Sequence, residues 1–407
     1  MGNGMVAAER SLSLYSLISR KNTPDPHNFY DRLAREAPVH WDPYTRCWLV
    51  SGRAEALQVL SDDVFSSGRL LHSDALHAHT SLADLSTVHK EIGKQLLFVD
   101  GDAHAKLRKI IQGVLTPRRL QPMKARISAL ADDLTDFSDG GPFDVVERIA
   151  QPLPFRVAAE FLGLPEDDFD TLKAWSDSYT DIVTGFEPTI GSAVASQMLS
   201  YLEYAVDLVR ARRRRPSGDG LSLIISAADG VSGLDDHSVA SNLIMLLAAG
   251  HQTAPGFLAG SVLEMVGPSS GFGPVGRVGA APDVEDLLAR VSPSRFVGRT
   301  AVRSTSVGGC VIEEGQSVLV LLAAVNWSDL RRQRRAVPVG QDRAPAHIAF
   351  GYGRHRCPGA YLAKLEGEIV LSAVERRFPD MRLAEEEISW DGNVNLPCPV
   401  RLNITNG

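Results

Sequence analysis

The sequence predicts a mainly α-helical protein with a minor β region, and three observations lead to this fold class. Apolar residues recur at helical spacing through most of the segment from about 104 to 245. Strand-like alternation is confined to short parts at about 37–52, 294–325 and 386–405. No internal repeat and no clear linker divides the 407 residues, so we expect a single domain over 1–407.

The chain begins with a predicted helix and a hairpin. PDPHNFYDRLAREAP carries Phe29, Leu33 and Ala37 at helical spacing. VHWDPYTRCWLVSG then alternates between apolar and polar residues, with a turn at Asp42-Pro43 between two short strands.

Helical patterns dominate the middle of the chain. They include HAKLRKIIQGVL, MKARISALADDLTDF, FRVAAEFLGL and SQMLSYLEYAVDLVRARRRR. The last pattern ends in the tract Arg212 to Arg215, where we expect a solvated helix end because cations suit a helix C-terminus. Residues 238–265 are apolar on nearly every side from Leu243 to Ala249, which predicts a helix buried inside the molecule.

The last third combines loops with short elements. Residues 267–283 are rich in Gly, Pro and Ser and predict a loop. VEDLLARV predicts a short helix, and RFVGRTAVRSTSVGGCVIEEGQSVLVLLAAVN predicts strands with a turn at Val307-Gly308-Gly309. Residues 328–347 are polar and basic and predict irregular structure.

Composition limits the classes of function. Apolar residues make up 44% and charged residues 22%, as in ordinary globular proteins. A net charge of −7 argues against nucleic acid as the main partner. No apolar stretch approaches the ~18 residues of a membrane span, and the start lacks a signal-peptide pattern. The four cysteines show no CxxC spacing, so we expect a reduced, cytoplasmic protein.

Cys357 is the main candidate for chemistry. It stands in FGYGRHRCPGAYLAKLE, residues 350–366, between a Gly-rich bend and an apolar helix. Pro358 suits the first turn of that helix, where backbone N–H groups and the helix dipole favour an anion. The residues alone permit a nucleophile, a metal ligand or a buried structural cysteine.

The neighbours of Cys357 discriminate between these roles. A zinc site needs three more clustered ligands, and only His355 is close. A Cys–His hydrolase needs a base facing the sulfur, and a histidine two residues away on one bend is badly placed. An inert cysteine leaves the glycines and the pair Arg354 and Arg356 unexplained. A single thiolate ligand to haem iron fits these features.

At this point the sequence resembles the bacterial-type cytochrome P450 family. The family's haem-ligand signature, Phe-Gly-x-Gly-x-His/Arg-x-Cys-x-Gly, is matched by Phe350, Gly351, Gly353, His355, Cys357 and Gly359. The resemblance implies the cytochrome P450 fold, with haem b between a distal and a proximal helix. It also implies that Cys357 binds the iron and that the ring of Phe350 packs near the sulfur.

Further matches to the family concern the haem propionates. LFVDGDAHAKLRKIIQGVLTPRRL resembles the family's propionate-binding segment, which implies this role for His104 and Arg108. The two residues lie four apart on one helical face, although the residues alone would equally permit an exposed cationic face. By resemblance, Arg299 in FVGRTAV and His355 are further propionate contacts.

AAGHQTA, residues 248–254, resembles the family's distal-helix signature Ala-Gly-x-Asp/Glu-Thr. The resemblance implies that Gly250 makes room for dioxygen and that Thr253 hydrogen-bonds it. Gln252 stands where the family has a proton-relaying acid, and an amide cannot donate and regain a proton near neutral pH. Without the resemblance, Thr253 could be a buried hydroxyl that caps a local carbonyl.

The residues around this signature predict a local change in the helix. Pro255 and Gly256 follow it, so we expect a kink or an opened turn. We expect His251 to be a packing or pocket residue rather than an iron ligand.

The chain departs from the family at the Glu-x-x-Arg motif. Alignment of VEDLLARVSP by its Ser-Pro end places Asp286 at the Glu and Ala289 at the Arg, and Arg290 comes one residue late. Arg331 stands in an unfamiliar setting where the family has a third, arginine partner. We therefore expect the usual buried cluster to be altered or missing.

The resemblance implies an oxidoreductase that acts on a small organic molecule, with dioxygen and with electrons from ferredoxin and its reductase, in secondary-metabolite biosynthesis. Two alternatives are a haem enzyme that catalyses coupling, rearrangement, dehydration or cyclisation without oxygen insertion, and a non-catalytic binding protein.

We expect the substrate pocket to draw on residues 69–95, with His72, His77 and His79, and on residues 294–297 and 393–396. A basic face for the electron donor is predicted at Lys106, Arg118, Arg119, Arg354 and Arg356.

Overall fold

The structure is a computed structural model that describes residues 12–14, 17, 26–68, 83–136, 141–184, 192–267, 283–333, 347–385 and 388–406. Within these ranges no helix is both long enough and apolar enough to cross a membrane. The predicted pocket residues His72, His77 and His79 lie outside the described residues, as does most of the Gly-rich stretch 267–283.

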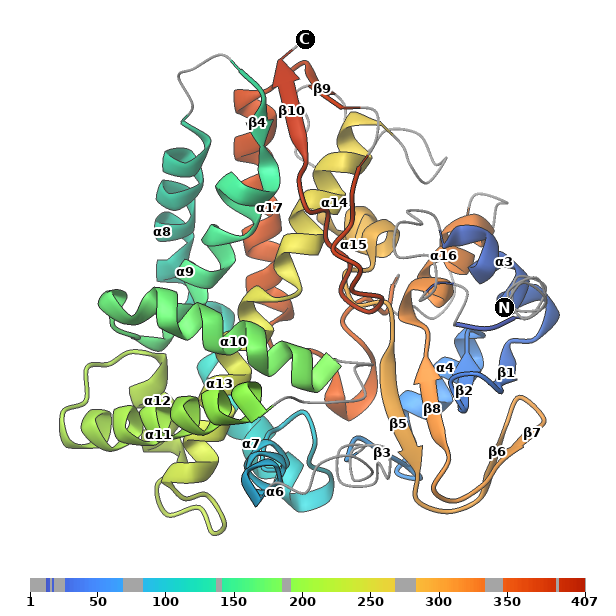
Figure 1. Cartoon of the computed structure of the whole chain (residues 1–407), viewed down its shortest axis with the longest axis horizontal. Helices are drawn as coiled ribbons and strands as arrows, with labels where there is room; N and C mark the ends of the chain where they lie inside the picture. Colours follow the sequence, from blue (N-terminus) through green and yellow to red (C-terminus); the bar gives the residue numbers. More distant parts are fainter. Residues whose placement is uncertain are drawn as a thin grey trace.

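Helices make up most of the described chain, as predicted (Figure 1). Their bounds are α3 His27–Glu36, α4 Arg53–Ser61, α6 Ala83–Ile92, α7 Gly101–Val114, α8 Pro117–Thr135, α9 Pro152–Leu162, α10 Phe169–Thr184, α11 Ser192–Arg214, α12 Gly220–Ala228, α13 Asp236–His251, α14 Ala254–Val266, α15 Val284–Val291, α16 Leu322–Gln333 and α17 Ala360–Arg377.

The strands form a minor part, also as predicted. The largest sheet has the order β1-β2-β8-β5-β3, with β1 Val39–Asp42, β2 Cys47–Val50, β8 Ser317–Val320, β5 Val297–Ala301 and β3 Phe65–Ser66. A second sheet joins β4 Phe143–Asp144, β10 Asn403–Asn406 and β9 Met381–Leu383, and the third is the hairpin of β6 Thr305–Val307 and β7 Cys310–Ile312. Gly308 and Gly309 form the predicted turn of that hairpin, with φ of +56° and +82°.

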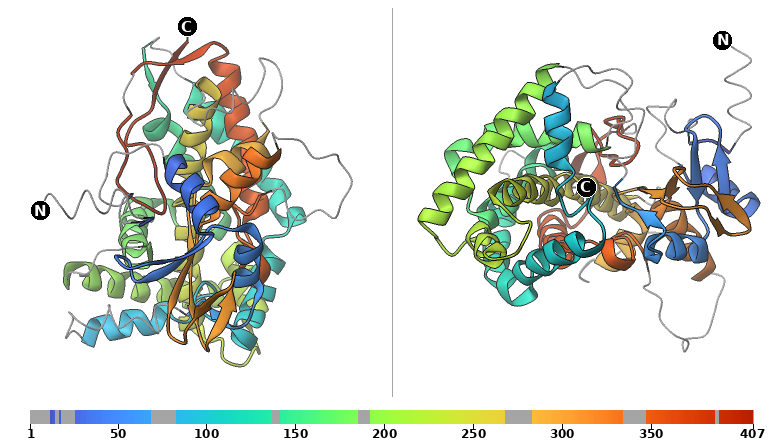
Figure 2. Two further views of the ribbon diagram at one scale, coloured as in Figure 1. Left: turned by 90° about the vertical axis from the view of Figure 1, so that its right-hand side faces the viewer. Right: turned by 90° about the horizontal axis from the view of Figure 1, so that it is seen from below.

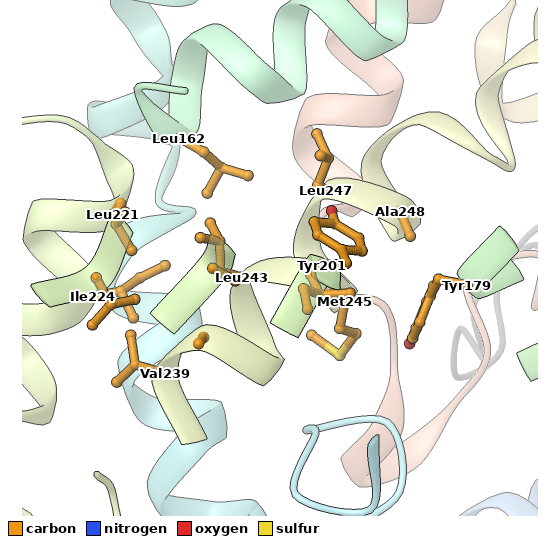
Figure 3. Close-up of a cluster of buried hydrophobic side chains, with 14 of the residues drawn as sticks. Leu162, Tyr179, Tyr201, Leu221, Ile224, Val239, Leu243, Met245, Leu247 and Ala248 are labelled. Carbon is orange, nitrogen blue, oxygen red and sulfur yellow. The ribbon is translucent and has the colours of Figure 1, made fainter. Parts of the chain in front are cut away.

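The two parts lie at opposite ends of the molecule. The sheet with β1, β2, β5 and β8 occupies one end, and α11 and α12 occupy the other (Figures 1 and 2). The long apolar pattern becomes α13 and α14, which run through the interior. In the close-up of the helical core, Leu243 of α13 lies among Leu162 of α9 and Leu221 of α12 (Figure 3). Burial of α13 on several sides confirms the prediction of an interior helix.

Two local predictions were wrong. Residues 322–326 were expected as strand and 328–333 as irregular, but both belong to α16, where Leu322 and Val325 turn into the core at helical spacing. The tract at Arg212 is a solvated helix end, as predicted, because Arg213, Arg214 and Arg215 are exposed. Arg212 itself is less exposed: it forms an ion pair with Asp219 and donates to the carbonyl of Gly163 at 2.7 Å. The helix over 322–333 and the partners of Arg212 depend on tertiary neighbours that the local pattern does not contain.

Candidate functional site

The loop before α17 is shaped by its own backbone. The N–H of Cys357 donates to the carbonyl of Phe350 at 2.8 Å, and the N–H of Gly351 donates to Ile348 at 2.8 Å. Gly351 and Gly353 both have φ of +71°, which side chains strongly disfavour. A Cβ on Gly353 would also lie 2.4 Å from a carbonyl oxygen of α4. Gly351 and Gly353 are therefore required by the bend itself.

Cys357 lies immediately before α17, which begins at Ala360, so Pro358 precedes the helix instead of opening it. Burial raises the pKa of the Cys357 thiol, while the N–H of Gly359 and the positive charges of Arg108 and Arg356 act to lower it. The chain thus surrounds the sulfur with groups that favour a thiolate, against the cost of desolvation.

A cluster of basic side chains, which we call the cationic cluster after its two arginines, lies near this loop. His104 and Arg108 come from α7, Arg299 comes from β5, and His355 comes from the loop; the rings of His104 and His355 have centroids 4.1 Å apart. Burial and the charges of His355 and Arg108 lower the pKa of His104 to about 4. The structure therefore brings together the four expected propionate contacts, from three separate segments of the chain.

The environment of the His104 side chain indicates whether this cluster fits an anionic group. The residue is 5% exposed, and its Nε2 has no hydrogen-bond partner among the described residues. A buried polar atom without a partner is costly, and an acceptor at this point would satisfy it. Carboxylates such as those of haem match the donors and positive charges gathered here.

Asp100 is a member of this cluster that sequence reasoning missed. Its Oδ1 lies 3.1 Å from Nε2 of His355, and its other oxygen accepts from the hydroxyl of Ser66 at 2.6 Å. Burial would raise the pKa of Asp100, but hydrogen bonds from His355 and Ser66 outweigh it and lower the pKa to about 2. Asp100 thus remains charged and orients His355. Its place directly before α7 was the only signal in the sequence.

Phe350 is partly buried and packs at the edge of the hydrophobic cluster beneath α17. The ammonium of Lys364 lies 5.7 Å from the centre of its ring, and the ring of His347 lies 5.8 Å away. Its backbone carbonyl accepts the hydrogen bond from the N–H of Cys357 at 2.8 Å.

The apolar helix is interrupted at the expected place. α13 ends at His251 and α14 starts at Ala254, with Gln252 and Thr253 between them. Pro255 has no N–H to donate to the carbonyl of His251, so the hydrogen-bond ladder opens here. The predicted kink or opened turn is thereby confirmed.

One face of this junction is not covered by protein. Ala249 is exposed, although Leu247 and Ala248 just before it are buried, and Thr253 lies one turn further on the same side. The hydroxyl of Thr253 makes no hydrogen bond to any described residue and does not cap α14. Thr253 is therefore not the local cap that its residue type alone would permit.

Gly250 serves helix packing in this structure. A Cβ at Gly250 would lie 2.9 Å from the Cβ of Ala158, so the missing side chain lets α13 approach α9 closely. The role of making room for dioxygen, which the family resemblance implies, remains a prediction.

Gln252 and His251 are both bound to α10. Nε2 of Gln252 donates to Oδ1 of Asp177 at 2.7 Å, and Nε2 of His251 lies 2.8 Å from the hydroxyl of Ser176. Burial lowers the pKa of His251 to about 4, so its ring is neutral at pH 7. His251 is thus a packing residue, as expected. Asp177 lies 75 residues from Gln252, and no sequence signal links them.

A buried charge cluster exists at the altered Glu-x-x-Arg segment. Arg290 donates to Asp286 at 2.8 Å and lies 3.5 Å from Glu264 of α14. The side chains of Arg290 and Glu264 are 9% and 7% exposed. Arg331, by contrast, forms an ion pair with Asp31 of α3 and does not join the cluster. The one-residue shift of the arginine is accommodated by a glutamate from another helix.

Two further sets of predicted residues can be placed. The expected pocket segments 294–297 and 393–396 meet, because the N–H of Arg295 donates to the carbonyl of Asn395 at 2.9 Å. Of the basic residues, Arg354 forms an ion pair with Asp63. The exposed members are Lys106, Arg118, Arg119 and Arg356.

The chain is similar to known proteins in sequence and in fold. No protein-family model matches the chain. It is 30% identical over 394 residues, 91% of each chain, to cytochrome P450-SU2 of Streptomyces griseolus. It is 29% identical over 382 residues, 91% of this chain and 88% of the relative, to the cytochrome P450 monooxygenase PikC of Streptomyces venezuelae. It is 26% identical over 385 residues, 91% of this chain and 93% of the relative, to the polyketide biosynthesis cytochrome P450 PksS of Bacillus subtilis.

Solved structures show the same fold. P450BioI, in complex with an acyl carrier protein that bears hexadec-9Z-enoic acid, matches with a TM-score of 0.80 and 26% identity, over 94% of this chain and 99% of that one. CYP164A2 of Mycobacterium smegmatis matches with a TM-score of 0.79 and 26% identity, over 96% and 99%.

Proposed function

Because this chain belongs to the cytochrome P450 family and is an enzyme whose cofactor is haem, we propose that it oxidises a small organic molecule in secondary-metabolite biosynthesis, with dioxygen and with electrons from a ferredoxin system. The observation that carries the proposal is Cys357 beside a buried cationic cluster in which Nε2 of His104 has no partner. The name of the relative PksS, which refers to polyketide biosynthesis, supports the class of pathway.

The residues have separate tasks in this proposal. When bound, haem supplies the activation of dioxygen. Cys357 holds the iron as a thiolate, which the N–H of Gly359 and the charge of Arg108 stabilise. The carboxylates of haem are held by His104, Arg108, Arg299 and His355.

On the oxygen side, Thr253 is the group that can hold a proton. Its hydroxyl has no hydrogen-bond partner among the described residues, so it can donate one hydrogen bond and accept another. Gln252 can hold water by hydrogen bonds but has no acidic proton to give. We assign Gly250 to the close approach of α13 at this point.

The electron donor docks, in this proposal, on the exposed cations Lys106, Arg118, Arg119 and Arg356. Ferredoxins suit such a face when they are acidic, because opposite charges steer association. We expect the double variant Arg118→Glu/Arg119→Glu to slow reduction by ferredoxin and to weaken the dependence of the rate on ionic strength. Arg210→Glu, on the distant helix α11, is the matched control. Equal rates for both variants would argue against this docking face.

The primary test is the absorbance spectrum of the purified protein, reduced with dithionite and exposed to carbon monoxide. We expect a strongly red-shifted Soret band, which reports a thiolate ligand, and its loss in Cys357→Ser. Cys398→Ser, on a partly buried cysteine elsewhere, should retain the band. A band at the position of a neutral-thiol or histidine-bound haem in the unaltered protein would contradict the proposal.

A second candidate function is favoured by Gln252, since an amide replaces the proton-relaying acid. In that case the haem enzyme would catalyse coupling, rearrangement, dehydration or cyclisation without inserting oxygen. Product formation without any reductant would support this candidate, whereas consumption of reductant in step with product would support the first. The names of the relatives, which include a monooxygenase, weigh against a protein that only binds a ligand.

A further inference from the structure

Two adjacent side-chain contacts join α10 to the end of α13. Asp177 accepts from Nε2 of Gln252 at 2.7 Å, and Ser176 lies 2.8 Å from Nε2 of His251. Figure 1 shows α10 lying against α13 in this part of the molecule. Two consecutive residues of α10 thus bind the last residue of α13 and the residue that follows it, at the point where the apolar helix is interrupted.

The contact with Asp177 fixes the orientation of the Gln252 amide. An ionised carboxylate only accepts hydrogen bonds, so the NH2 end of the amide must face it. The carbonyl oxygen Oε1 of Gln252 then has no hydrogen-bond partner among the described residues. Oε1 and the hydroxyl of the next residue, Thr253, are thus side-chain polar atoms at this junction that have no hydrogen-bond partner among the described residues.

Asp177 also connects the junction with solvent. Its side chain is 48% exposed, and its Oδ2 accepts from Nζ of Lys173 at 3.0 Å. From α13, the titratable side chain that interacts with Asp177 is His251, whose ring is neutral at pH 7 because burial lowers its pKa to about 4. From α11 the neighbour is the uncharged Gln197, which binds Ser178. A carboxylate therefore touches both water and the amide that replaces an acid on the distal helix.

We propose that Asp177 is a positioning residue of the oxygen side, and that it supplies from α10 the carboxylate that the distal helix lacks at Gln252. It holds the Gln252 amide by its NH2 end, leaves Oε1 to bind water, and exchanges protons with solvent beside the amide. The inference rests on the proposed function, because the positioned group acts only if dioxygen is bound on this side.

The test compares three variants of the haem-loaded full chain. Asp177→Asn removes the charge, Asp177→Glu retains it, and Asp170→Asn removes an exposed carboxylate from the same helix as a matched control. Asp177 is half exposed, so we expect all three variants to fold. In Asp177→Asn we expect the product formed per reducing equivalent to fall roughly 10-fold. Asp177→Glu should recover most of the loss, and Asp170→Asn should match the unaltered enzyme.

A second readout does not depend on turnover. In the reduced, carbon monoxide-bound protein, the side-chain amide signals of ¹⁵N-labelled Gln252 should shift in Asp177→Asn, because the amide loses its carboxylate acceptor. They should keep their positions in Asp170→Asn. The C–O stretching frequency should shift in Asp177→Asn alone, since the polar surroundings of the oxygen side change.

The failures of the inference and of the proposed function are distinguishable. If the unaltered protein lacks the red-shifted Soret band, the proposed function fails, and the inference fails with it. If every variant shows that band and Asp177→Asn keeps normal coupling and normal Gln252 amide signals, the inference alone is overturned.

Discussion

The cysteine side and the oxygen side of this site are built in different ways. On the cysteine side, the N–H of Cys357 binds Phe350, and the N–H of Gly351 binds Ile348, so the bend is closed within about ten residues of sequence. On the oxygen side, Gln252 and His251 depend on side chains of α10 that lie 75 residues away. The sequence motif therefore describes the whole bend around Cys357, but it describes the junction at Gln252 only in part.

The difference between the two sides shows which structural features can be predicted from a sequence motif. Backbone angles and short-range hydrogen bonds follow from glycine positions, which the sequence displays directly. The partner of a side chain on a buried helix depends on which helix packs against it, and many sequences could supply that partner. The Arg290 cluster belongs to this second type, because Glu264 replaces an expected partner from elsewhere in the chain.

The largest effect that would test this comparison concerns Arg290. We expect Arg290→Met to lower the free energy of unfolding by about 3–5 kcal/mol, because it leaves the buried carboxylate of Glu264 and the partly buried carboxylate of Asp286 without this arginine. Urea unfolding of the haem-loaded protein measures this change in the free energy of unfolding. Arg331→Met, which breaks an exposed pair with Asp31, should cost about 0.2–1 kcal/mol. Equal costs would mean that the shifted arginine has no special structural role.

A smaller effect is expected at the cationic cluster. His104→Leu removes the unpartnered Nε2 that we assign to a haem carboxylate. A hydrogen bond to a charged group contributes about 1.5–3 kcal/mol, so haem should be lost about 10- to 100-fold faster. Transfer of haem to an excess of apomyoglobin measures the rate. Lys109→Leu, on the exposed face of the same helix, should leave the rate unchanged; a similar increase in both would reject the assignment.

The smallest effect concerns pH and the oxygen side. Burial depresses the pKa of His251 from 6.5 to about 4, so the unfolded chain binds a proton at this residue before the folded chain does. The stability that this difference provides is present above pH 6.5 and is lost as the pH falls toward 4. At pH 5.5 the loss is about 1.4 kcal/mol.

Urea unfolding at pH 7.5 and pH 5.5 measures this dependence. In His251→Gln the change in stability between the two pH values should shrink by that amount. His40→Gln, on strand β1, should keep the full dependence and serves as the control. An unaltered slope in His251→Gln would show that burial does not keep the ring of His251 neutral.

Much of the fold could be predicted from local patterns. The hairpin at Asp42-Pro43, the turn at Gly308-Gly309 and the interruption before Pro255 all follow from residues that restrict or free the backbone. The helix over 322–333 could not, because Leu322 and Val325 fit either a strand or a helix until the core is assembled.

Local sequence was enough to predict Cys357 as the candidate haem ligand, the bend around it and the residue types of the cationic cluster. Glycines at φ of +71° and a cysteine before a helix leave the backbone little choice there. Only the tertiary structure decided that Asp100 holds His355, that Glu264 joins Arg290, and that Asp177 holds Gln252. The physical reason is that a charged or amide side chain must be satisfied when it is buried, but its partner is chosen by packing between elements distant in sequence.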